Sequence, residues 1–297
     1  MLFRWLIFLP HIIIISGCTS VIAIGTAYDA AAGQFRKELL SYADFNTRQE
    51  REIRNRVAAF HQWHRSDQLP RYLALMQQIT TALDTPAGIR REDVGQWSET
   101  FSQFTGLLGS CSPMNHSGEF LQTLSDRQVR QIAVKIRDRH IQRVKEYQSQ
   151  TTAERLKERQ KLIAKWAGRA GVKLNSEQKV LVERTLQKQI SLSPQRHELW
   201  QRWSDQLISK LNKRGGDTFT TDINEHIESL WKLTERSYPQ QWQDNIALWE
   251  DFMYQFIQLM SEEQQGAVRK KIAAVSAALN KIHNKPAKSQ ATCFASP

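Results

Sequence analysis

Few residues in the sequence have types and spacings suited to catalysis or metal binding. His61, His64 and Asp67 follow one another at three-residue intervals, which would place three potential ligands on one side of a helix. No second pair of His or Cys residues stands at a ligand-like spacing, so an amphipathic helix edge explains the pattern better. The nucleophile-elbow, phosphate-loop and HExxH motifs are also missing. We therefore predict no catalytic residues, no metal site and no cofactor.

The amino-terminal segment is typical of an export signal. Arg4 precedes an apolar run from Trp5 to Ile15 that is too short to span a bilayer comfortably. The run ends in Ile15-Ser16-Gly17-Cys18, which resembles the lipobox of bacterial lipoproteins. That resemblance implies cleavage after residue 17, acylation of Cys18 and, because Thr19 rather than Asp follows, delivery to the outer membrane. The protein would then be anchored to the membrane by its acyl chains. The alternative is an ordinary cleaved signal with a coincidental cysteine.

Export also bears on the two remaining cysteines. Thiols in an oxidising compartment tend to pair, so we predict a disulfide between Cys111 and Cys293. The alternative is two unpaired thiols, with Cys293 in a frayed tail.

The elements that carry these residues are predicted to be helical throughout. The 297 residues are 40% hydrophobic and 24% charged, with only 13 Gly and 8 Pro, which excludes disordered, collagen-like and low-complexity chains. Apolar residues three and four apart are common, whereas sustained two-residue alternation is missing. The clearest helical stripe follows Ser125 and contains Val129, Ile132, Ala133, Ile136, His140, Val144 and Tyr147. The sequence therefore predicts an all-α fold, built as a helical bundle or as two packed helical units.

Four predicted helices begin with the same signal. An apolar residue precedes an Asn or Ser N-cap, and Gln follows three residues after the cap, which is a capping box with a hydrophobic staple. These glutamines are Gln49, Gln128, Gln178 and Gln264. Similar offsets relate the first to the third and the second to the fourth, and Ser66–Leu69 recurs in order as Ser204–Leu207. An internal duplication would explain this order, and coincidence among common helix-start residues is the alternative.

The domain organisation follows from these patterns. We predict a signal peptide over 1–17, a tether over 18–33, an N-terminal helical unit over 34–170, a C-terminal helical unit over 171–284 and a tail over 285–297.

Positive charge is concentrated in the middle of the chain. Residues 127–173 hold 14 Lys or Arg and four Asp or Glu, in a chain whose formal net charge is +11. We predict a basic partner surface there, formed by Arg127, Arg130, Arg137, Lys145, Arg155, Lys157, Arg159 and Lys161. In the envelope such a surface would attract an anionic lipid or an acidic envelope protein, and export excludes nucleic acid. The alternative is a solvated face with pairs such as Glu154 with Lys157 or Glu158 with Lys161.

Several motifs resemble known families. Tyr42-Ala43-Asp44-Phe45, Trp63-His64-Arg65, Leu69-Pro70-Arg71-Tyr72 and Leu124-Ser125 with Gln128 are similar to a family of uncharacterised proteobacterial lipoproteins. The similarity is best over 36–150 and implies an exported, lipid-anchored helical protein with no known active site. A second similarity is to periplasmic helical stress chaperones, because the four helix starts resemble their Leu-Thr-x-x-Gln motif. Ser or Asn replaces Thr here.

These observations predict a function in three ranked versions. The first is an outer-membrane-anchored periplasmic lipoprotein, not an enzyme, which presents residues 127–173 to an anionic or protein partner. The second is a chaperone-like holder of unfolded exported proteins. The third is an envelope hydrolase, which only the predicted compartment supports.

Overall fold

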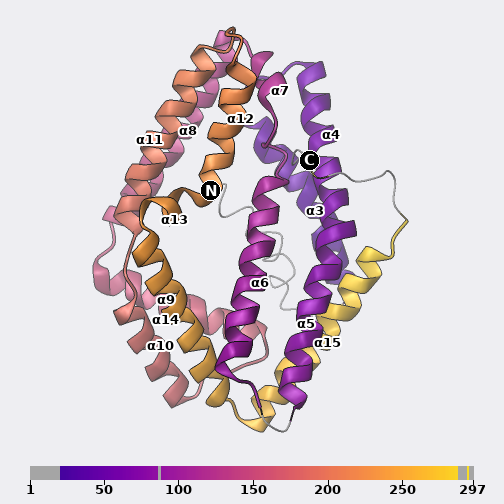
Figure 1. Cartoon of the computed structure of the whole chain (residues 1–297), viewed down its shortest axis with the longest axis vertical. Helices are drawn as coiled ribbons and strands as arrows, with labels where there is room; N and C mark the ends of the chain where they lie inside the picture. Colours follow the sequence, from indigo (N-terminus) through magenta and orange to yellow (C-terminus); the bar gives the residue numbers. More distant parts are fainter. Residues whose placement is uncertain (1–20, 86–87, 287–292, 294–297) are drawn as a thin grey trace.

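The computed structural model describes residues 21–85, 88–286 and 293, and every regular element within these ranges is helical, which confirms the predicted all-α fold. The longer helices form an elongated array, drawn in Figure 1 with the numbering used here. They are α3 (Val21–Leu40), α4 (Thr47–Trp63), α5 (Leu69–Asp84), α6 (Arg91–Ser110), α8 (Asp126–Gln148), α9 (Thr152–Arg169), α10 (Ser176–Lys188), α11 (Ser193–Asn212), α14 (Pro239–Gln258) and α15 (Glu262–His283). Shorter helical segments are α7 (Gly118–Gln122), α12 (Phe219–Ser229) and α13 (Leu233–Ser237).

A π-helical turn, His64–Gln68, joins α4 to α5 without a loop. Pro70 lies in the first turn of α5, directly after the π-helical turn, and the run of helical residues is not interrupted there. The helix axis therefore continues past the proline, and the irregularity lies one turn earlier.

The four predicted helix starts meet in two pairs. Each of the four glutamines closes a capping box at its own helix. Gln49 and Gln128 also exchange side-chain hydrogen bonds of 3.2 and 2.7 Å, which join the start of α4 to the start of α8. Gln178 and Gln264 do the same at 2.9 and 3.1 Å between α10 and α15. The same arrangement thus occurs twice, which supports the predicted duplication.

Three apolar clusters hold the helices together. The first packs Tyr28 and Phe60 against Leu279, and so joins α3 and α4 to α15. The second joins the start of α8 to α11 and α12 through Val129 and Trp203. The third lies between α9, α10 and α14. In Figure 1, α15 accordingly runs beside α5, and α8 beside α11.

Two predicted domain boundaries differ from this arrangement. Helix α3 begins at Val21, so residues 21–33 are not a tether: Ile24, Tyr28 and Ala31 are buried at helical spacing, the first two of them in the first cluster. Residues 34–170 and 171–284 do not form separate cores either, because α15 packs on α3 and α5 while α11 packs on α8. Apolar faces from each range find their complement in the other, which local periodicity does not reveal.

Candidate functional site

One face of α8 is an exposed stripe in which cations alternate with apolar side chains. Arg130, Val134, Arg137, Ile141 and Lys145 are all exposed, and at 100° per residue they lie within a narrow sector of the helix. Val134 is 54% and Ile141 43% exposed, which is high for β-branched residues. Within the described residues, none of the three cations forms an ion pair. We call these five residues the α8 stripe.

The other predicted cations have mostly intramolecular contacts. Arg127 binds the Asp44 carboxylate at 2.7 Å and Lys161 binds Glu158 at 2.7 Å, the latter as the sequence suggested. Arg155 stacks on the Tyr147 ring at 4.4 Å and donates to the carbonyl of the same residue at 3.0 Å. Thr151, rather than Lys157, holds Glu154, because this glutamate completes a capping box.

Arg159 turns toward α10 and contacts the Gln189 side chain, and burial lowers the pKa of its guanidinium. Lys157 remains exposed on α9, a helix with no fully buried residue. The predicted basic surface is therefore reduced to the cations of the α8 stripe and to Lys157 on α9.

The opposite face of α8 carries two arginines that the sequence interpretation missed. Arg139 contacts the Glu38 carboxylate and donates to the Tyr42 hydroxyl at 2.9 Å. The guanidinium of Arg143 lies over the Trp200 ring at 5.4 Å. Burial raises the pKa of Tyr42, so the hydroxyl stays protonated. The sequence feature that indicates an inward-facing position is their place among the apolar residues of the helix, next to Ile136.

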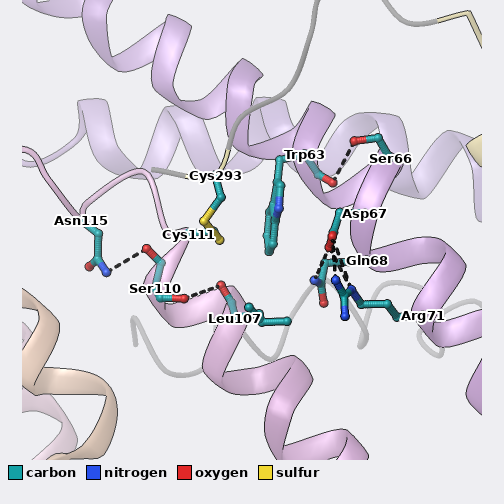
Figure 2. Close-up of a disulfide and its surroundings, with 10 residues drawn as sticks. All are labelled: Trp63, Ser66, Asp67, Gln68, Arg71, Leu107, Ser110, Cys111, Asn115 and Cys293. Carbon is teal, nitrogen blue, oxygen red and sulfur yellow. Dashed lines mark hydrogen bonds and ion pairs between the residues drawn. A yellow bond between two sulfur atoms is a disulfide. The ribbon is translucent and has the colours of Figure 1, made fainter. Parts of the chain in front are cut away.

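Cys111 and Cys293 are joined by a disulfide, as the sequence predicts, with their Cα atoms 4.8 Å apart. Figure 2 shows the bridge beside the Trp63 indole at the end of α6. Cys111 is buried in the first apolar cluster, and Cys293 packs against it. The bridge ties the carboxyl-terminal tail to a residue 182 positions earlier. Cys18 lies outside the described residues.

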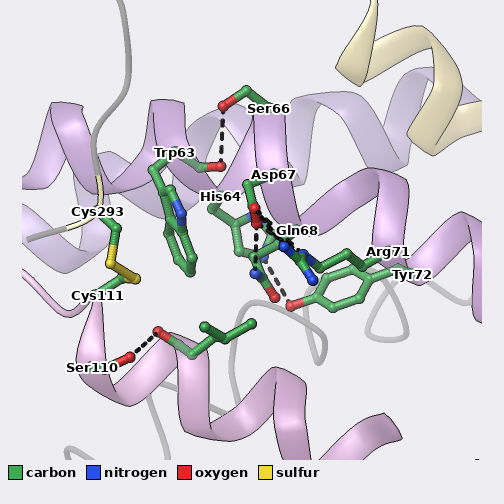
Figure 3. Close-up of polar contacts among 11 residues, drawn as sticks. Trp63, His64, Ser66, Asp67, Gln68, Arg71, Tyr72, Ser110, Cys111 and Cys293 are labelled. Atoms are coloured by element: carbon green, nitrogen blue, oxygen red, sulfur yellow. Dashed lines mark hydrogen bonds and ion pairs between the residues drawn. A yellow bond between two sulfur atoms is a disulfide. The ribbon is translucent and has the colours of Figure 1, made fainter. Parts of the chain in front are cut away.

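His61, His64 and Asp67 do not converge. Buried His64 lies between the hydroxyls of Tyr28 at 2.9 Å and Tyr72 at 3.3 Å, the latter contact visible in Figure 3. Desolvation lowers the pKa of His64 to about 3, so the ring is neutral. Asp67 instead binds Arg71 at 2.9 Å. Throughout the described part of the chain, no group of three or more His, Cys, Asp or Glu side chains is placed to hold a metal ion.

One known protein family matches this chain. The profile of a family of unknown function, DUF6279, matches residues 41–238. The chain belongs to this family. Searches among curated proteins and solved structures found no significant match.

The DUF6279 match spans the α8 stripe, both arginines of the inner face and Cys111, whereas Cys18 and Cys293 fall outside it. Of the helices that the structure describes, none is both long and apolar enough to cross a bilayer.

Proposed function

We propose that this DUF6279 protein is an outer-membrane-anchored periplasmic lipoprotein, without enzymatic activity, that presents the α8 stripe to an anionic or protein partner of the envelope. Acylated Cys18 would supply the anchor, and no nucleic acid is involved. The proposal rests on one observation: Arg130, Arg137 and Lys145 project from one helix face without a carboxylate partner among the described residues, and two apolar side chains lie between them.

The physical argument concerns both charge and apolar area. Each Lys or Arg near an anionic membrane surface contributes about 1 kcal/mol, and salt screens this attraction over a Debye length of about 8 Å at physiological ionic strength. Three cations on one face therefore supply about 3 kcal/mol. Val134 and Ile141 stand between the cations and would lose water contact when the face docks.

Vesicle binding tests the stripe. The mature chain from Thr19 onward, which lacks the acylated cysteine, is mixed with vesicles of phosphatidylglycerol and phosphatidylcholine. Replacing Arg130, Arg137 and Lys145 by Gln should weaken vesicle binding about a hundredfold. Raising the salt concentration should also weaken binding of the parent protein, because salt screens the same charges. Replacing exposed Arg48, Arg51 and Arg54 of α4 by Gln is the charge-matched control. Equal loss in both triple variants would leave net charge, not the stripe, as the cause.

The anchor has its own test. Mass spectrometry of the protein purified from native membranes should find diacylglycerol on an amino-terminal Cys18, and Cys18→Ser should abolish membrane retention. An unmodified Cys18 that still follows its leader would refute the lipoprotein part of the proposal.

A second candidate function is a holder of unfolded exported proteins. The exposed apolar residues Val134, Ile141 and Leu162 next to cations favour it, since an unfolded client offers apolar and acidic segments. It predicts that the protein suppresses aggregation of a denatured client, and that Val134→Ser with Ile141→Ser weakens this effect. An unchanged aggregation rate with the parent protein would exclude the holder.

A further inference from the structure

An apolar cavity of about 140 Å³ lies against the inner face of α8, opposite the α8 stripe. Segments far apart in sequence build its wall, from the end of α3 to α12. The lining is mostly aliphatic and aromatic, and includes Leu39, Phe45, Ile136, Leu207 and Ile227. An engineered cavity of about 150 Å³ in another protein stays dry and binds benzene, so this one matches an apolar body of about six carbon atoms.

The charged side chains of this wall are engaged within the protein. Three arginines line the cavity, and each has a contact of its own: Arg56 with Glu52, Arg139 with Glu38 and Arg143 with the ring of Trp200. An anionic ligand would have to give up one of these contacts to gain a guanidinium, whereas a neutral ligand needs no such exchange. The electrostatics of the wall therefore favour a neutral ligand.

One polar atom of the wall differs from the arginines. The indole Nε1 of Trp200, on α11, is buried and has no hydrogen-bond partner among the described residues. Four buried side-chain nitrogens or oxygens of the described chain lack a partner, and this is the one that belongs to a residue lining the cavity. Leaving a buried donor without an acceptor is costly. Water suits the place poorly, since a buried water needs several polar partners, so an otherwise apolar ligand that accepts one hydrogen bond fits better.

The indole N–H also restricts the polar group that a ligand can present. An N–H of this kind donates and does not accept, so the ligand must supply an acceptor. A carbonyl oxygen accepts without bringing a donor of its own. An alcohol would add an O–H group, which would need a second acceptor in apolar surroundings. A carbonyl is therefore the better match.

We propose that this cavity binds a small neutral carbonyl compound, a ketone or an ester whose apolar part has about six carbons. The carbonyl oxygen accepts a hydrogen bond from Trp200 Nε1, and the carbon body packs against Ile136 and Leu207. Phe45, Phe120 and Trp200 line the cavity and are only half-buried, so a small ligand can enter from the solvent. The site is separate from the α8 stripe, because its residues occupy the other side of the helix, and it does not depend on the proposed function.

Equilibrium dialysis with radiolabelled cyclohexanone tests the site, using the full-length protein in zwitterionic nanodiscs and empty nanodiscs as the blank. We expect saturable binding of one cyclohexanone per chain. Cyclohexanecarboxylate and cyclohexylamine, which carry a charge on a ring of the same size, should compete at least about tenfold less well than unlabelled cyclohexanone. Equal competition by either charged compound would overturn the assignment of a neutral ligand, and the lack of saturable binding would overturn the site.

Variants separate the hydrogen bond from the cavity, with benzene as a second ligand that has a similar size and no carbonyl. Trp200→Phe removes the N–H, so it should weaken cyclohexanone binding roughly threefold to tenfold more than benzene binding, the range for a net hydrogen bond. Ile136→Phe should block both ligands by filling the cavity. Arg137→Gln on the opposite face is the control and should bind both like the parent. An unchanged ratio of the two affinities in Trp200→Phe, with circular dichroism showing native helicity, would refute the hydrogen bond even if Ile136→Phe fails to fold.

A measurement on the parent protein keeps the test independent of how the variants fold. In the ¹⁵N-labelled protein, cyclohexanone should shift the proton resonance of one tryptophan indole N–H downfield, because that proton gains an acceptor, and benzene should not. The lack of such a shift at saturating cyclohexanone would refute the assignment of Trp200 Nε1 as the donor.

Discussion

The reciprocal glutamine pairs allow a quantitative test of how distant helices are held together. Gln178 is fully buried, and its side chain takes part in four hydrogen bonds. Its side-chain oxygen accepts from the backbone N–H of Asn175 at 3.0 Å and from the side-chain Nε2 of Gln264 at 3.1 Å. Its nitrogen donates to the Gln264 oxygen at 2.9 Å and to the Leu259 carbonyl at 3.3 Å. Gln178→Leu keeps the volume and nearly the helix propensity but removes all four.

The expected loss follows from these contacts. A hydrogen bond contributes about 1 kcal/mol net, and partners left unsatisfied in the interior add to the loss, while the new leucine regains some apolar burial. We therefore expect the free energy of unfolding to fall by roughly 3 kcal/mol, or the Tm by roughly 6–12 °C. Urea unfolding followed by tryptophan fluorescence and by circular dichroism measures this change.

A matched control and a double-mutant cycle make the test decisive. Gln187 lies on the same helix, is exposed, and contacts only Glu183 at 3.3 Å, so Gln187→Leu should change stability by less than about 0.5 kcal/mol. Combining Gln178→Leu with Gln264→Leu should cost at least about 1 kcal/mol less than the sum of the single changes, because neither amide is then left without its partner. Additive effects, or a Gln178 variant as stable as the Gln187 control, would refute the reasoning.

Three further predictions concern the core. Reduction of the Cys111–Cys293 bridge should destabilise the protein by up to about 5 kcal/mol, because it closes a loop with a sequence separation of 182; equal Tm values with and without reductant would contradict this. The pKa of His64 is about 3 in the folded state and about 6.5 in the unfolded state. Its contribution to the free energy of unfolding should therefore be fully present above pH 6.5 and decline as the pH falls toward 3, by about 2 kcal/mol at pH 5. Urea titrations at pH 7.5 and pH 5 measure this difference, and it should disappear in His64→Gln. An unchanged pH dependence in the variant would argue against burial of a neutral ring. Gly109→Ala should destabilise α6 by roughly 1–3 kcal/mol, because its Cβ would lie 2.8 Å from the Trp231 ring, while Gly106→Ala, with nothing within 4 Å, should stabilise it by about 0.5–1 kcal/mol; the same sign for both in thermal melts would contradict the packing.

Local sequence signals predicted the helices well and the domain boundaries poorly. The capping boxes at Asn46, Ser125, Asn175 and Ser261 could be read directly, because a cap and its glutamine are three residues apart in any context. The tether predicted over 18–33 differs from the structure from residue 21 on, because Ile24, Tyr28 and Ala31 have helical spacing and are buried against other helices.

The candidate site shows the same division. Counting charges located the basic segment, but not which cations face outward. Arg127, Arg155 and Arg159 have partners from other turns or helices, while Arg130 and Arg137 do not among the described residues. The contacts of Arg139 and Arg143 could not be predicted, because the partner of a cation within an apolar stripe depends on which helix faces it.

The sequence by itself determined the helical fold, the places where helices begin and the segment that carries the excess charge, because each depends on residues within a few turns of one another. Tertiary structure alone decided that Gln49 meets Gln128 and Gln178 meets Gln264, and that α15 returns to α3 and α5. These outcomes depend on which apolar faces can be buried together along the whole chain, and that competition among packings has no local signature.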